Sequence, residues 1–231
     1  MSAKEYDVIV IGAGPTGENV ADRAVKGGLQ AVIVEADLVG GECSYWACIP
    51  SKALLRPLQA LTAAQSVAGA REAITGSLDA AQIFARRDSF TGHWNDKGQS
   101  DWLRNAKIDL VRGHARLSGE RKVIVTEKNG STLELIARHA VAVCTGSRAA
   151  IPATPGLAEA RPWTSREATS AREAPNRLAI IGGVWSHARW RQLGRVSGLS
   201  RSRSSSADRG SFQTLNRLRA LSCRAPLSDG A

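Results

Sequence analysis

Short apolar runs alternate with longer mixed segments in the first part of the chain. Residues 6–11 (YDVIVI) and 31–34 (AVIV) are largely β-branched runs of strand length, a pattern typical of parallel strands buried on both faces. A helix-length segment lies between them and ends at Lys26, where Gly27 and Gly28 interrupt it. The order strand, helix, strand predicts a βαβ unit and an α/β fold.

A glycine turn of the form G-x-G-x-x-G joins the first strand to the helix. Gly12 permits a tight turn, Gly14 permits close approach to a pyrophosphate, and Gly17 permits close contact between helix and strand. The helix N-terminus offers free N–H groups to phosphates. Glu35, at the end of the second strand, can accept hydrogen bonds from ribose hydroxyls and would repel a 2′-phosphate. The turn alone is a weak signal, because glycine-rich turns are common, but the whole unit predicts a dinucleotide site.

Further short strands are expected between residues 108 and 144. They are residues 108–111, 123–126, 133–136 and 140–144. Asn129-Gly130 is a hairpin signal between the second and the third of them. The last strand leads into Thr145-Gly146-Ser147, whose small residues again permit close approach of a ligand. A separate apolar run, residues 178–181, has the composition of another buried strand.

The net charge of +10 belongs to the end of the 231-residue chain. Residues 185–231 hold nine Arg and two Asp, a net charge of +7, which leaves +3 for residues 1–184. This tail is also rich in Ser and has no apolar period, so its composition predicts disorder. No apolar run is long enough for a membrane span or a secretory signal, so we expect a cytoplasmic protein without a membrane partner.

Cys43 and Cys48 lie five residues apart, between Gly40-Gly41 and Pro50. They could be a redox couple, half of a metal site or two small core residues. A close cysteine pair in a reducing cytosol is more often catalytic or metal-binding than structural. A regular helix would separate the two by about 7.5 Å along its axis, so a disulfide between them requires a distorted turn. The other two Cys and the four His show no ligand spacing, so we expect no metal.

Taken in order, these motifs resemble the flavoprotein disulfide reductases, or class I pyridine nucleotide-disulfide oxidoreductases, which include dihydrolipoyl dehydrogenase and mercuric reductase. The resemblance covers residues 5–183 and is most specific at GGECSYWACIPSK, residues 40–52. It implies a Rossmann-like FAD-binding domain of the glutathione reductase type, with a parallel sheet and a small antiparallel β-meander. It also implies an oxidoreductase, similar to dihydrolipoyl dehydrogenase, that passes electrons between NAD(P)H, FAD and a Cys43–Cys48 disulfide.

The resemblance also implies a role for each site residue. Cys48 would contact the flavin as a thiolate, Cys43 would exchange with a small disulfide or dithiol substrate, and Lys52 would lie near the reactive edge of the flavin. The backbone of His114 and Ala115 would meet the adenine. The expected cofactor-binding residues are Gly12, Ala13, Gly14, Gly17, Glu35, Ala36, Gly40, Gly41, Cys43, Lys52, His114, Ala115, Thr145, Gly146 and Ser147.

The cysteine segment departs from the commonest family pattern at two places. Glu42 stands where Thr is usual, and Ser44-Tyr45-Trp46-Ala47 replaces a usual Leu-Asn-Val-Gly. We expect Tyr45 and Trp46 to crowd the ground between the cysteines. There they would either influence which substrate is accepted or serve ordinary packing.

The family pattern stops after Gly183. In the family, a strand such as residues 178–181 opens the NAD(P)-binding domain and leads into a second glycine motif, but here the frame from Gly182 reads G-x-V-x-x-H. The NAD(P)H site and the homodimer interface of the family would lie further on. We therefore expect a truncated fragment that completes no turnover with NAD(P)H. The expected divisions are an FAD-binding domain at residues 1–150, a linker and first strand of the next domain at residues 151–184, and the tail at residues 185–231.

The tail has two different interpretations, a frameshift and a functional segment. Reading the codons one base out of phase from about Gly183 permits Gly-Gly-Val-Val-Ala-Cys-Glu-Met, so a frameshift, real or a sequencing error, would explain the tail. The rival hypothesis is a nucleic-acid-binding segment whose arginines neutralise phosphates. A solvated tail is the preferred interpretation, and nucleic acid is not an expected partner.

Overall fold

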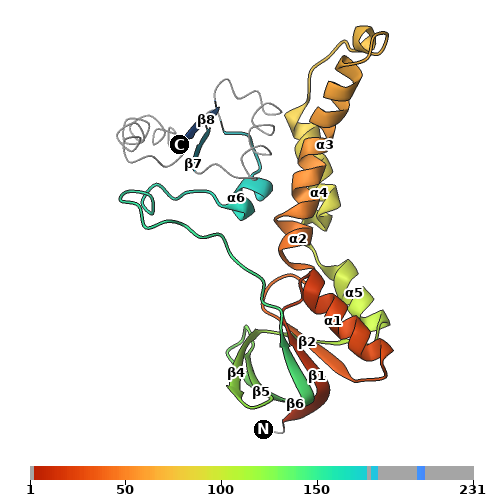
Figure 1. Ribbon diagram of the computed structural model, residues 1–231, viewed down its shortest axis with the longest axis vertical. Helices are drawn as coiled ribbons and strands as arrows, with labels where there is room; N and C mark the ends of the chain where they lie inside the picture. The colour runs from red at the N-terminus through yellow and green to blue at the C-terminus, as the bar shows by residue number, and fades with distance from the viewer. Residues whose placement is uncertain (1–2, 176–177, 182–201, 206–231) are drawn as a thin grey trace, which may run out of the picture. The chain divides into compact units, whose positions relative to one another are not determined.

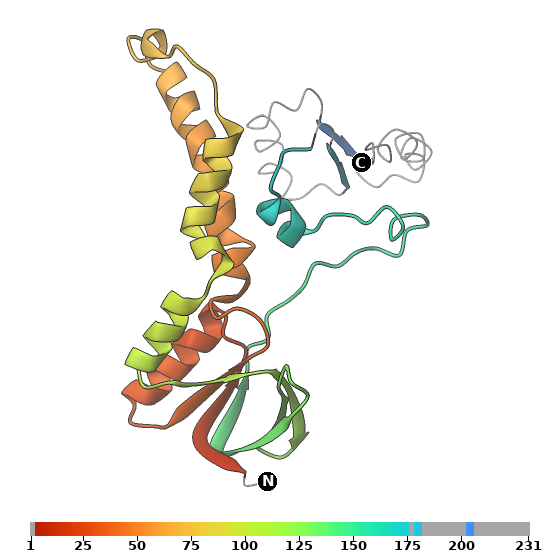
Figure 2. The ribbon, with the colours of Figure 1, turned by 180° about the vertical axis from the view of Figure 1, so that it is seen from behind.

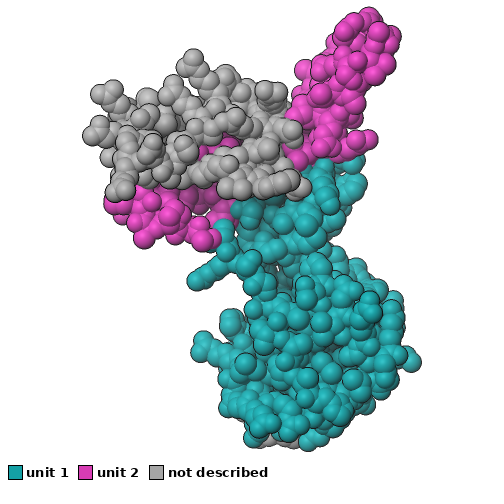
Figure 3. Space-filling view, in the orientation of Figure 1, with its two compact units in different colours: residues 1–53, 84–149, 165–170 teal, residues 54–83, 150–164, 171–231 magenta. Residues whose placement is uncertain are grey.

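The computed structural model describes residues 3–175, 178–181 and 202–205. The chain divides into two compact units (Figure 3). Unit 1 comprises residues 1–53, 84–149 and 165–170, and unit 2 comprises residues 54–83, 150–164 and 171–231. All of the residues expected to bind a cofactor fall in unit 1, so the site can be built from this unit alone.

Unit 1 contains a six-stranded mixed sheet in the order β3-β2-β1-β6-β5-β4 (Figure 1). Its parallel part consists of β1 (Lys4–Ile11), β2 (Ala31–Glu35), β3 (Asp109–Arg112) and most of β6 (Thr132–Val143). Its antiparallel meander consists of β4 (His114–Gly119), β5 (Lys122–Thr126) and the first part of β6, visible from behind in Figure 2. The predicted α/β class, with a parallel sheet and a small meander, is confirmed.

Two details of the meander differ from the prediction. The expected strands 133–136 and 140–144 are one long strand, β6, because it pairs antiparallel with β5 over Thr132–Ile136 and parallel with β1 over Leu135–Val143. β4 was not predicted, because its sequence, HARLSG, is mostly exposed and has no apolar alternation. Its strand character comes from pairing with β5.

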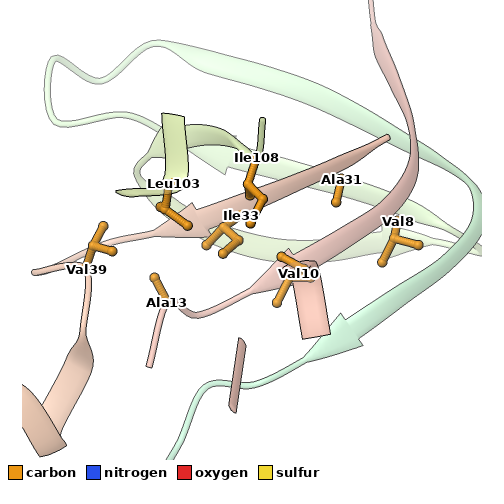
Figure 4. Close-up of a cluster of buried hydrophobic side chains, with 9 residues drawn as sticks. Val8, Val10, Ala13, Ala31, Ile33, Val39, Leu103 and Ile108 are labelled. Atoms are coloured by element: carbon orange, nitrogen blue, oxygen red, sulfur yellow. The ribbon is translucent and has the colours of Figure 1, made fainter. Parts of the chain in front are cut away.

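Both faces of β1 and β2 are buried, which explains their nearly continuous apolar sequence. On one face Val8, Val10 and Ile33 pack with Ala21 of α1 (Pro15–Lys26) and Leu103 of α5 (Lys97–Asn105) (Figure 4). The other face packs against the meander, through Ile9, Ile11, Val32, Val34, Val123, Val125, Leu135 and Ala137. The glycine turn therefore leaves β1 from the centre of a two-sided core.

The remaining elements are mostly helical. They are α2 (Gly41–Tyr45), α3 (Cys48–Gln65), η1 (Arg71–Ala73), α4 (Ala80–Phe90), η2 (Gly92–Trp94) and α6 (Ser165–Ser170). Within unit 2, β7 (Leu178–Ile181) forms the expected strand and pairs in parallel with β8 (Ser202–Ser205), in a segment for which no element was predicted. The rest of the predicted tail, with the frame from Gly182, lies outside the described residues. Among the described helices, none combines the length and the apolar character that a membrane crossing needs.

Candidate cofactor cradle and redox site

The glycine turn between β1 and α1 is closed by backbone contacts. The N–H of Gly12 donates to the carbonyl of Val34 at 2.8 Å, and the N–H of Cys144 donates to the carbonyl of Ile11 at 2.8 Å. Gly12 has φ +102°, and a Cβ on it would lie 2.4 Å from the carbonyl oxygen of Cys144. Only glycine fits between these backbone segments, as the sequence predicts.

The other two glycines of the turn have opposite surroundings. A Cβ on Gly17 would lie 1.9 Å from the carbonyl oxygen of Gly12, so Gly17 permits the close contact between α1 and β1. A Cβ on Gly14 would have no atom within 4 Å. No side chain caps the start of α1, and Pro15 occupies its first turn. The backbone at Gly14 therefore borders open space at an uncapped helix N-terminus, which suits an anionic ligand.

Glu35 is held at the rim of this turn. Its Oε2 accepts a hydrogen bond from the N–H of Ala13 at 2.6 Å, and its Oε1 accepts one from the N–H of Asp37 at 2.7 Å. Its own carbonyl accepts the N–H of Gly113 at 3.0 Å, immediately before His114. Each carboxylate oxygen keeps a second lone pair, so Glu35 can still accept hydrogen bonds from ribose hydroxyls.

The end of β6 reaches the same turn. The Cα of Thr145 would lie 3.3 Å from a Cβ on Gly12, and Thr145, Gly146 and Ser147 are exposed. Ala36 is exposed beside Glu35, whereas Ala115 packs against the second core cluster. The predicted residues from four separate segments are thus gathered at one end of the parallel strands. We call this arrangement of residues 12–17, 35–36, 40–41 and 145–147 the cradle.

The cysteine segment begins directly against the cradle. The N–H of Gly40 donates to the carbonyl of Ala13 at 2.7 Å, and a Cβ on Gly41 would lie 2.9 Å from the Cα of Gly14. The preceding loop is fixed by the N–H of Val39, which donates to Asp96 at 2.8 Å. The two backbone segments touch, so the start of the cysteine segment forms part of the cradle wall.

Cys43 lies in α2, and Cys48 is the first residue of α3. The helix is interrupted at Trp46 and Ala47, which is the distorted turn that the spacing of the cysteines requires. Both cysteines are half-buried. In the part of the chain that the structure describes, no three His, Cys, Asp or Glu side chains are grouped to hold a metal.

The two thiols influence each other. Burial raises the pKa of the Cys43 thiol, and its hydrogen bond to Cys48 and the charge of Cys48 raise it further. The positive charge of Lys52 acts in the opposite direction and favours the Cys43 thiolate. Cys43 therefore holds its proton more tightly than an ordinary thiol.

A family model described as pyridine nucleotide-disulphide oxidoreductase matches residues 6–186, which include the whole cradle and the cysteine pair. The chain belongs to this family. The family binds FAD and NAD(P), and the fold is that of the FAD-binding domain of a flavoprotein disulfide reductase.

The similar oxidoreductases are longer than this chain. The dihydrolipoyl dehydrogenase of Chlorobaculum parvum is 34% identical over 185 residues, covering 79% of this chain but 39% of the relative. Dihydrolipoyl dehydrogenase 3 of Pseudomonas aeruginosa is 38% identical over 199 residues (83% and 42%), and the mercuric reductase of Staphylococcus aureus is 30% identical over 180 residues (77% and 32%). The chain thus spans about two fifths of the length of the dihydrolipoyl dehydrogenases.

A solved structure has the same fold. It is the Cu(II) complex of the HOCl-induced flavoprotein disulfide reductase RclA from Escherichia coli, with a TM-score of 0.70 and 21% sequence identity. The similarity covers 88% of this chain and 42% of that one. This comparison supports the fold assignment for the described part of the chain.

The two side chains of the aromatic pair, Tyr45 and Trp46, have different surroundings. Tyr45 is 1% exposed and packs against Gly40, so its side chain belongs to the core. Burial raises the pKa of Tyr45 to about 12, and the carboxylates of Asp96 and Glu18 contribute. Trp46 is half-buried, and the guanidinium of Arg166 lies over its indole ring. Ordinary packing, the second of the two expectations, accounts for Tyr45.

Arg166 is a site residue that the sequence analysis missed. The guanidinium lies 3.9 Å from the centroid of the Trp46 ring and bonds both Glu42 and Asp37. The hydroxyl of Thr169 donates to the carbonyl of Trp46 at 3.0 Å, so α6 is fastened to the cysteine segment. Arg166 and Thr169 are more than a hundred residues from their partners Glu42 and Trp46 in the sequence, so local patterns do not reveal these contacts. The only hint in the sequence was that Glu42 and Trp46 depart from the usual family residues.

Lys52 provides a pH-dependent test of the thiol pair. We expect Lys52→Met to slow alkylation of Cys43 by iodoacetamide about threefold at pH 8, because loss of the positive charge raises a pKa that burial already holds above its ordinary value. At pH values below that pKa, the alkylation rate should rise about tenfold per pH unit, because the thiolate is the nucleophile. Mass-spectrometric mapping of alkylated Cys43 across pH measures both effects. Lys52→Arg is the matched control and should keep the wild-type rate; equal slowing in both variants would contradict the electrostatic account.

Proposed function

We propose that this chain is the FAD-binding part of a disulfide reductase similar to dihydrolipoyl dehydrogenase, with FAD in the cradle and Cys43 and Cys48 as its redox couple. The contact between Gly41 and Gly14 is the observation that carries the proposal. It makes one short segment both a wall of the cradle and the support of the two thiols. A dinucleotide bound at Gly14 therefore lies at the start of the segment that bears the cysteines, as electron transfer between them needs.

The cradle suits the pyrophosphate of FAD. Gly14 borders open space, the N-terminus of α1 is uncapped, and Glu35 is fixed where it can accept hydrogen bonds from a ribose. When bound, FAD supplies storage for two electrons between NAD(P)H and the cysteine pair. We assign Lys52 to the neighbourhood of the flavin and the backbone of His114 and Ala115 to the adenine.

The cysteine pair then performs thiol–disulfide exchange. Cys43 gives up its proton and attacks one sulfur of a small disulfide, which forms a mixed disulfide and releases one substrate thiolate that takes up a proton. The Cys48 thiolate attacks the sulfur of Cys43, which releases the second substrate thiol and forms the Cys43–Cys48 disulfide. Two electrons and two protons restore the dithiol. With a dithiol substrate the same steps run in reverse.

The other properties of the family are proposals for the whole protein. Membership of the pyridine nucleotide-disulphide oxidoreductase family supports NAD(P)H as the electron partner. By resemblance to that family we also propose a small dithiol or disulfide as substrate and a homodimer as the assembly. The residues that would set these properties lie beyond the cradle.

Cofactor binding tests the proposal. We expect the purified 231-residue chain to bind one FAD and to change the fluorescence of the flavin, whereas FMN, which lacks the pyrophosphate and adenine, should bind far more weakly. Isothermal titration calorimetry with each cofactor gives the stoichiometry and the affinities. A folded chain that binds FAD no better than FMN would contradict the proposed use of the cradle.

A further inference from the structure

Several carboxylates lie around the cradle of this protein. Glu18 is in the first turn of α1, Glu35 is at the rim, Asp37 follows Glu35 two residues later, and Glu42 comes immediately after the glycine that touches Gly14. The pyrophosphate of a dinucleotide carries two negative charges. Uncompensated carboxylates beside it would weaken its binding, because like charges in a partly buried site repel each other.

Arg166 bridges two of these carboxylates. Its Nη1 donates to Oδ2 of Asp37 at 3.0 Å, and its Nε donates to Oε1 of Glu42 in a short hydrogen bond. Burial lowers the pKa of Arg166, but its hydrogen bonds to both carboxylates outweigh this and raise it. One guanidinium therefore neutralises part of the charge of Asp37 and Glu42 while they remain beside the cradle.

The position of Arg166 is fixed by further contacts. The guanidinium stacks on Trp46 at 3.9 Å, and the hydroxyl of Thr169 holds the carbonyl of Trp46 at 3.0 Å. The buried Arg87, 1% exposed, donates to the carbonyl of Thr169 at 3.1 Å. The short helix α6 is thus tied at several points, which keeps a charged side chain with 45% exposure in one place.

We propose that Arg166 is the counter-ion that makes the cradle of this chain compatible with an anionic dinucleotide, and that Glu42 is the carboxylate it chiefly offsets. The inference rests on the proposed function, since it assigns a positioning role toward FAD. It also explains how this chain accepts Glu42 where the family usually has Thr: the same chain supplies the compensating charge from α6.

The experiment compares FAD affinities of four variants by fluorescence titration at low and high salt. Arg166→Gln should weaken FAD binding about fivefold to tenfold at low ionic strength, and high salt should remove most of that loss, because the charges are partly exposed. Arg166→Gln combined with Glu42→Gln should recover most of the affinity. Glu42→Gln alone should tighten binding. Arg23→Gln, in the last turn of α1 at the opposite end from the cradle, removes an equal charge and should have little effect.

The outcomes separate this inference from the function on which it rests. If the wild-type chain binds no FAD, the proposed function fails and the inference fails with it. If the wild-type chain binds FAD but Arg166→Gln binds equally well, or binds weakly at every salt concentration without rescue by Glu42→Gln, the counter-ion role alone is overturned. Should Arg166→Gln not fold, the Glu42→Gln variant decides: unchanged affinity at low salt overturns the inference.

Discussion

Replacing Gly17 with alanine is expected to destabilise unit 1 by about 3 kcal/mol, because the new Cβ would lie 1.9 Å from the carbonyl oxygen of Gly12. The obstacle is backbone rather than the end of a flexible side chain, so α1 would have to move away from β1. That movement would open the core at Ala21, which packs with Val8 and Val10. Urea unfolding followed by circular dichroism measures the loss in the free energy of unfolding.

Gly14→Ala is the matched variant and should behave in the opposite way. Its Cβ enters open space, and the φ of −76° at Gly14 suits alanine, so the free energy of unfolding should fall by about 1 kcal/mol or less. FAD affinity should fall about tenfold or more, because the methyl group keeps the pyrophosphate from charge-assisted hydrogen bonds at the helix N-terminus. An added methyl group should therefore reduce stability at Gly17 and reduce FAD binding at Gly14.

The pair of variants tests the cradle as a whole. Calorimetric FAD titration of Gly14→Ala, with circular dichroism to establish that it is folded, separates the two effects. Equal stability of Gly17→Ala and wild type would mean that α1 does not approach β1 as closely as described. Wild-type FAD affinity in a folded Gly14→Ala variant would place the pyrophosphate elsewhere.

The cradle could be predicted from sequence because its requirements are steric and local. Gly12 and Gly17 are needed where two backbones meet, and such positions admit a single residue type, so the motif specifies the geometry. The parallel strands were predicted for a similar reason, since burial on both faces demands continuous apolar runs. The meander was predicted less well: β4 exists through its partner β5, and an exposed strand carries little pattern of its own.

The contacts of α6 with the cysteine segment could not be predicted in the same way. Arg166 and Glu42 meet only because the chain returns to the site after the meander, and charged residues on an exposed six-residue helix have no periodic signature. Tyr45 shows how burial decides between two expectations. An aromatic residue next to two cysteines could influence the substrate or serve ordinary packing, and the burial of Tyr45 against Gly40 favours packing.

Substitution of either cysteine is expected to reveal which thiol contacts the flavin. In the FAD-loaded, reduced chain, a thiolate in contact with oxidised flavin would produce a long-wavelength charge-transfer absorbance. We expect Cys48→Ser to abolish this band and Cys43→Ser to retain it, because Cys48 is the proposed contact of the flavin, whereas burial raises the pKa of Cys43. Absorbance spectra recorded anaerobically measure the band, and both variants should bind FAD like the wild type, since neither thiol supports the turn at Gly14.

The reactivity of Cys43 provides a second measurement. Alkylation by iodoacetamide should require a higher pH than an ordinary thiol needs, because burial and the neighbouring Cys48 raise the pKa of Cys43. A band that survives in Cys48→Ser and disappears in Cys43→Ser would exchange the two roles. In that case Cys43 in α2, and not Cys48 at the start of α3, would face the flavin.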